Sequence, residues 1–163
     1  MCEALTAGYK EKIRKLEAQL NPPSPPVEVG MIESGEVWQL LFNLFPNNDK
    51  IFLSDNRYQI TSISEIRRFI EWDNTNIFSY EAEIHDCDDF ALALAGDFAK
   101  HPRWSGFPVG IIWADYGIGA HAFLTCIAWN EDKMPTVYFI EPQNDHEIVM
   151  ESFGDAILYL LTI

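Results

Sequence analysis

The feature that most constrains this chain is an apolar stripe of helical period between Asp86 and Pro102. Its members recur every three or four positions, which is one face of an α-helix: Cys87, Phe90, Ala91, Leu94, Ala95 and Phe98. Asp86 is suited to cap the first turn, because a carboxylate there accepts from free main-chain amides. Pro102 cannot continue a helix. The sequence therefore predicts one buried helix over about 87–100.

The hydrophobic period changes from 3.6 to 2 after this helix. Three strands are predicted, over 109–113, 120–129 and 136–141. A glycine-bearing turn at 115–119 joins the first two, and a hairpin loop at 130–133 joins the last two. Helices come first and an antiparallel sheet follows, so the expected class is α+β, with the central helix packed on the sheet.

The chain before the central helix predicts smaller elements. A helix is expected over 34–44, stopped by Pro46, and a second over about 62–72, where Ser62 and Glu65 form a capping-box pattern. Short strands are expected at 51–53 and 57–60. A closing helix is predicted over 152–161, with Ile157, Leu158 and Leu161 turned inward.

Three segments are expected along the chain. Residues 1–21 form an N-terminal helical arm, residues 22–30 a proline-rich linker, and residues 31–163 the main domain. The apolar positions of the arm suit self-association into a homo-oligomer, and they suit packing back on the domain equally well.

Charge and cysteine content exclude several classes of protein. The net charge of −14 argues against binding to nucleic acid or to anionic membranes, since phosphate groups need Lys and Arg. No apolar run approaches the roughly 18 residues of a membrane span, and the N-terminus lacks a signal-peptide core. Three cysteines without zinc-site spacing suit a reducing compartment, so a cytoplasmic location is expected.

Cys87 is the cysteine for which reactivity can be argued. At a helix start it faces free amides and the positive end of the helix dipole, which favour thiolate. His121 lies on the strand 120–129, and Cys126 on that strand points to the opposite face. Glu141 ends the following strand, where its carboxylate could accept from a His121 ring nitrogen and so fix the tautomer. Asp145 is a second candidate for that role.

These segments resemble the papain-like and transglutaminase-like cysteine hydrolase superfamily. Within it they are most similar to bacterial and phage proteins related to the C-terminal domain of Marasmius oreades agglutinin. The motifs that carry the resemblance are Asp86-Cys87-Asp88-Asp89-Phe90-Ala91, Gly119-Ala120-His121-Ala122-Phe123 and Phe139-Ile140-Glu141-Pro142-Gln143. The resemblance implies the fold of a cysteine protease, an activity that responds to calcium, and a peptide or protein substrate. It also implies a catalytic triad of Cys87, His121 and Glu141.

The chain departs from the papain-like pattern beside the nucleophile. Asp88 stands where those enzymes usually place tryptophan, and the stretch before Cys87 lacks their glutamine oxyanion donor. The Cys87 amide and Gln143 are the candidate oxyanion donors. Trp113, on the strand before His121, is a candidate wall of the substrate cleft.

The aspartates around Cys87 oppose the thiolate. One carboxylate about 5 Å away disfavours thiolate by about 3 kcal/mol at an effective dielectric near 20, whereas the helix dipole offers under about 1 kcal/mol. Imidazolium at His121 could supply the missing positive charge, and so could calcium bound by Asp88 and Asp89. A solvated acidic first turn is the alternative that needs no ion.

Three functions follow from these residues. The first is a cysteine hydrolase or acyltransferase acting on amide bonds. The second is a catalytically silent scaffold that serves as a binding or assembly module. The third is a metal-dependent protein with oxygen and nitrogen ligands from Asp88, Asp89, His121 and Glu141.

Overall fold

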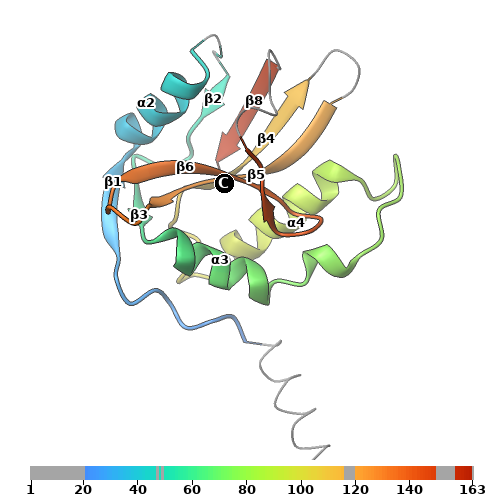
Figure 1. Ribbon diagram of the computed structural model, residues 1–163, viewed down its shortest axis with the longest axis horizontal. Helices are drawn as coiled ribbons and strands as arrows, with labels where there is room; N and C mark the ends of the chain where they lie inside the picture. Colours follow the sequence, from blue (N-terminus) through green and yellow to red (C-terminus); the bar gives the residue numbers. More distant parts are fainter. Residues whose placement is uncertain (1–20, 47, 49, 116–119, 150–156, 163) are drawn as a thin grey trace, which may run out of the picture.

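The computed structural model describes residues 21–46, 48, 50–115, 120–149 and 157–162 (Figure 1). The predicted N-terminal helix lies outside these residues. The described elements, in chain order, are β1 (Gly30–Glu33), α2 (Ser34–Leu44), β2 (Ile51–Phe52), β3 (Arg57–Ile60), α3 (Ile63–Trp72), the 3₁₀ turn η1 (Thr75–Ile77), α4 (Cys87–Lys100), β4 (Val109–Asp115), β5 (Ala120–Trp129), β6 (Pro135–Glu141), β7 (His146–Glu147) and β8 (Ile157–Thr162).

A six-stranded sheet of order β2-β8-β4-β5-β6-β7 forms the centre of the fold. Its neighbouring strands are antiparallel, except that β2 and β8 run parallel. A second sheet pairs β1 with β3. The α+β class is therefore confirmed, and the helices at 34–44 and 87–100 are confirmed with their predicted bounds. None of the helices in the described ranges is long and apolar enough to cross a bilayer.

Both faces of the central sheet are covered, so the molecule has three layers (Figure 1). On one face α3 and α4 pack against the sheet, and Ile66, Phe69, Leu94 and Phe98 belong to this core. On the other face α2 and the β1–β3 sheet form a second core, whose buried residues include Ile32, Val37, Leu41, Tyr58 and Ile60.

Strand β5 contributes to both cores, because successive side chains of a strand point to opposite faces. Leu124 and Cys126 belong to the core beneath α4, whereas Phe123 and Ile127 belong to the core beneath α2. Burial on both faces explains why this strand is apolar at nearly every position instead of alternating with polar residues.

The predicted closing helix is wrong where the structure describes it. Residues 157–162 form strand β8, which pairs antiparallel with β4 in the register Trp113↔Tyr159. A short apolar run fits a buried strand as well as a buried helix, and pairing with the exposed edge of β4 decides between them.

Two smaller differences lie near the start of the domain. The capping box at Ser62 is not formed, because the Ser62 hydroxyl lies 2.8 Å from that of Ser64 and Glu65 binds Arg68, yet α3 still begins at Ile63. Strand β1 occupies the junction between the expected linker and the expected domain.

Gly30, in β1, is required by a close approach to Trp129. A Cβ at this position would lie 2.6 Å from a Trp129 ring carbon, well inside van der Waals contact. Gly35, in α2, has open space around the corresponding position. The two glycines therefore offer a matched test of this packing.

We expect Gly30→Ala to lower the free energy of unfolding by about 1–3 kcal/mol, because the Trp129 ring must move. Gly35→Ala is the control, and it should be neutral or stabilise by up to about 1 kcal/mol, since alanine favours a helix. Urea unfolding midpoints of both variants check the difference. Equal effects of the two substitutions would contradict the close approach.

Candidate functional site

The first turn of α4 is held by a reciprocal capping box. The Asp89 carboxylate accepts the Asp86 main-chain N–H at 3.1 Å, and the Asp86 side chain accepts from the third residue of the helix. Asp89 thus serves the helix end that the sequence predicted. The cap places Cys87 as the first helical residue, half-buried against the core beneath α4.

The Cys87 thiol is not activated by its position. Burial raises its pKa above the usual value, and the negative charges of Asp86 and Asp88 raise it further. Hydrogen bonds from the main-chain amides of Ala122 and of Cys87 itself oppose this shift in part. The expected help of the helix start is therefore outweighed, and the thiol form is favoured at neutral pH.

His121 and Glu141 form the expected pair across neighbouring strands. His121 Nε2 lies 2.6 Å from Glu141 Oε2, and the carboxylate accepts this proton. The second oxygen, Oε1, accepts the main-chain N–H of Gln143 at 3.3 Å. Glu141 therefore fixes the orientation of the imidazole, and the Gln143 main chain fixes Glu141.

Cys87 and His121 lie near one strand end without a bond between them. The thiol accepts from Ala122, on the sheet face that α4 covers. His121 points toward the other face of the sheet, as Phe123 does. The ring centroids of His121 and Phe123 lie 5.9 Å apart. Among the residues that the structure describes, no hydrogen bond joins the thiol to the ring.

Asp86, Cys87 and Asp88 are close enough together to hold a metal ion. Their ligand atoms all lie within 4.8 Å of one another. The pKa of Asp88 is raised, chiefly by a hydrogen bond shared with Asp86, and that of Asp86 is lowered by the same bond. Two crowded carboxylates suit a hard cation such as calcium, whereas the Cys87 sulfur is a poor ligand for such an ion. Of the predicted ligand pair Asp88 and Asp89, Asp88 belongs to this cluster, and Asp89 accepts the Asp86 main-chain N–H instead.

A loop beside this cluster presents apolar side chains to solvent. Ile77, Phe78, Tyr80 and Ile84 are 70%, 60%, 55% and 70% exposed. Main-chain bonds in both directions between Glu81 and His85, of 2.9 and 2.8 Å, close the last five residues of this loop. We call residues 77–85 the apolar loop. Sequence reasoning missed it, because its aperiodic apolar residues do not reveal that they are exposed.

Aromatic contacts join the apolar loop to α4. The His85 ring stacks on Phe90 at 4.5 Å between centroids and meets Phe78 edge-on at 5.9 Å. Partial desolvation, followed by the charges of Asp86, Cys87 and Glu83, raises the pKa of the Tyr80 hydroxyl. The loop therefore borders the acidic start of α4.

Among the described residues, the side chains of Trp113 and Asp145 make no hydrogen bond to His121 or Glu141, although the Asp145 main-chain N–H donates to the Glu141 carbonyl at 2.8 Å. Trp113 is half-buried against the core beneath α4. Asp145 has positive φ and accepts from the Asn76 amide at 2.5 Å, so it ties the β6–β7 turn to η1 and does not contact His121. Burial raises the pKa of Asp145 to about 6.

Asp145→Asn should stabilise the protein at high pH. A raised pKa means that the folded state binds the Asp145 proton more tightly than the unfolded state does, so the contribution of this proton to stability is full below the ordinary pKa of 3.8 and is lost as the pH rises through about 6. We expect the free energy of unfolding of the variant to exceed that of the wild type by up to about 1 kcal/mol at pH 8, after solvent screening. Near pH 4 the two values should be equal.

Melting temperatures across this pH range test the Asp145 expectation. Asp73, whose pKa burial also raises to about 6, is present in both proteins and cancels in the comparison. Asp132→Asn, in the exposed β5–β6 hairpin, is the control. A stability difference that does not change with pH would contradict the assignment.

The raised pKa of Cys87 predicts slow alkylation. In a Cys2→Ser background, iodoacetamide at pH 8 should label Cys87 more slowly than free cysteine, and His121→Ala should leave the rate unchanged. Cys126 is fully buried and its pKa is raised to about 12, so it should not react with iodoacetamide. Mass spectrometry of the labelled peptide measures the rate. Fast labelling at pH 6 that depends on His121 would reverse this conclusion.

Solved structures with the same fold include two lectin chains. One is Polyporus squamosus lectin bound to the human-type influenza-binding epitope Neu5Acα2-6Galβ1-4GlcNAc, with 24% identity, a TM-score of 0.63 and coverage of 79% of this chain and 49% of the lectin. The other is the PSL1a–E64 complex, with 24% identity, a TM-score of 0.63 and coverage of 79% and 48%. This chain thus spans about half the length of each. No protein-family model and no curated protein matches it.

These neighbours contradict the predicted cysteine hydrolase and its catalytic triad of Cys87, His121 and Glu141. The chains that share the fold are lectins, and one of them carries a bound sugar epitope. They agree better with the alternative interpretation as a binding module. The resemblance to an agglutinin is consistent with them, whereas a papain-like hydrolase is not. The fold of this chain is that of the Polyporus squamosus lectin chains over 79% of its length.

Proposed function

We propose that this chain is a binding module without catalytic activity and that its ligand is a neutral glycan. The proposed site is the apolar loop together with the acidic first turn of α4. The observation that carries the proposal is the exposure of four large apolar side chains on the apolar loop beside a cluster of hydrogen-bonding groups. Exposed apolar patches rimmed by polar residues mark binding surfaces.

The chemistry of the site matches both sides of a sugar. The C–H face of a pyranose packs on an aromatic ring, for which Phe78 and Tyr80 are available. Sugar hydroxyls donate to carboxylates, and Asp86 and Asp88 lie next to this loop. The solved lectin with its bound epitope supports a glycan as the ligand class.

Charge selects among glycans. The net charge of −14 and the paired acids at the start of α4 repel anionic sugars. We therefore propose neutral glycans as ligands, in contrast to the sialylated epitope of the lectin, whose sugar-binding properties belong to a protein about twice as long.

Several finer assignments belong to the same proposal. The scaffold is papain-like or transglutaminase-like in topology and related to the C-terminal domain of Marasmius oreades agglutinin, with the ligand site near the predicted residues Cys87, His121 and Glu141. A calcium ion at Asp86 and Asp88 would relieve the repulsion between the two acids. Peptide or protein segments are the alternative ligand class. A cytoplasmic location and oligomerisation through residues 1–21 complete the proposal.

Replacing a loop aromatic should weaken glycan binding selectively. We expect Phe78→Ala or Tyr80→Ala to lower affinity about tenfold, which corresponds to the loss of one stacked ring of roughly 1.4 kcal/mol. Phe52→Ala is the matched control, because Phe52 is 62% exposed on β2 and lies outside the proposed site. Titration calorimetry, on neutral glycans selected from a glycan array, measures the affinities.

The same titrations separate the remaining proposals. Addition of calcium should tighten binding in the wild type and have no effect in Asp88→Asn. Absence of binding to all neutral glycans, or an equal loss in Phe52→Ala, would contradict the glycan site. Peptide binding that depends on Phe78 would keep the site and change the ligand class.

A further inference from the structure

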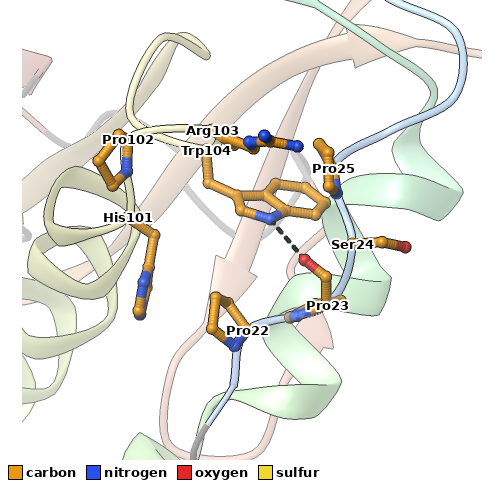
Figure 2. Close-up of a pocket in the computed structure, with 8 residues that line it drawn as sticks. All are labelled: Pro22, Pro23, Ser24, Pro25, His101, Pro102, Arg103 and Trp104. Atoms are coloured by element: carbon orange, nitrogen blue, oxygen red, sulfur yellow. Dashed lines mark hydrogen bonds between the residues drawn. The ribbon is translucent and has the colours of Figure 1, made fainter.

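The proline-rich segment at residues 21–26 lies in a groove of the domain (Figure 2). Pro22, Pro23 and Pro25 are half-buried, Pro26 is buried, and Ser24 faces solvent. Figure 2 shows the prolines in a row along one side of the Trp104 ring, with His101 and Pro102 across from them. The segment predicted as a linker therefore packs on the domain as a strap.

Two side chains of the groove bind successive carbonyl groups of the segment. The indole N–H of Trp104 donates to the Pro23 carbonyl at 3.1 Å. The Arg68 guanidinium donates to the Ser24 carbonyl at 2.6 Å and lies 5.5 Å from the centre of the Trp104 ring. Glu65, on the same helix, holds Arg68 in place by an ion pair of 2.5 Å.

This contact pattern is that of polyproline recognition. Prolines fix φ near −65° and restrict the residue before them, so the segment is extended before it binds. An extended polyproline chain makes no internal hydrogen bonds, and its carbonyls need outside donors. Aromatic grooves that supply such donors bind proline-rich segments at a low entropic cost.

The strap leaves part of the groove open. A pocket of about 240 Å³ remains between the segment and the domain, lined by Pro22, Pro23, Ser24, Pro25, His101, Pro102, Arg103 and Trp104. A groove with open volume beside the strap differs from a close-packed core, and it leaves room for a ligand that is larger than the strap.

We propose that the groove of Trp104, Arg68 and His101 is a recognition site for proline-rich peptides and that residues 22–26 occupy it in cis. Residues 27–29 connect the strap to β1, and the Glu28 carbonyl in this connection accepts from the Thr61 hydroxyl at 2.7 Å. This tether gives the strap a high effective concentration, so the wild-type site is masked toward peptides in solution. A proline-rich segment of another protein binds where the strap is released.

The test uses the full chain and a fluorescent peptide with the strap sequence, Asn-Pro-Pro-Ser-Pro-Pro-Val. Pro23→Ala combined with Pro25→Ala weakens the strap and keeps the groove intact. We expect this double variant to bind the peptide at least roughly tenfold tighter than the wild type does, because the tethered competitor is lost. Fluorescence anisotropy gives the affinity, and the NMR resonance of the Trp104 indole N–H reports the site.

Controls distinguish recognition from simple packing. Pro135→Ala, in the β5–β6 hairpin, should bind the peptide as weakly as the wild type, and a peptide with alanine at every proline should bind neither protein. If the double variant does not fold, a strap peptide that carries a nitroxide label at millimolar concentration should broaden the Trp104 indole resonance of the wild type. Absence of peptide binding under both conditions, or binding that leaves this resonance unchanged, would overturn the proposal.

Discussion

Burial of strand β5 on both faces is the constraint on which the rest of the structure depends. Every side chain from Ala122 to Ala128 is buried. Main-chain pairing with β4 and β6 satisfies its amides and carbonyls, and apolar layers must then cover both faces. The helices α3 and α4 cover one face, and α2 with the β1–β3 sheet covers the other. The hydrophobic effect thus fixes where α4 begins relative to the sheet.

The candidate site lies where this burial ends. At the first residues of β5 the chain reaches solvent. The capped start of α4 contacts Ala122 there, next in sequence to His121 with its partner Glu141, and the apolar loop borders the same helix start. Burial of Cys87 keeps its thiol neutral and so disfavours nucleophilic chemistry. The crowding of Asp86 and Asp88 creates a strongly negative surface, which favours a cation or hydroxyl donors.

Sequence periodicity predicted the elements that have strong local signals. The helix over 87–100 was readable from one apolar stripe and its Asp86 cap, and the pairing of His121 with Glu141 followed from two adjacent strands. The strand β8 was misread as a helix because its apolar run has no distinctive period. The Asn76–Asp145 bond joins residues that are far apart in the chain, so no local pattern could predict it.

The sequence by itself determined the α+β class, the central helix, the three main strands, and the acidic character of the helix start, because period, caps and charge are local properties. Only the tertiary structure decided the protonation preference of Cys87, the exposure of the apolar loop, and the seating of the proline-rich strap against Trp104. Each of these depends on burial, which is set by contacts between distant parts of the chain.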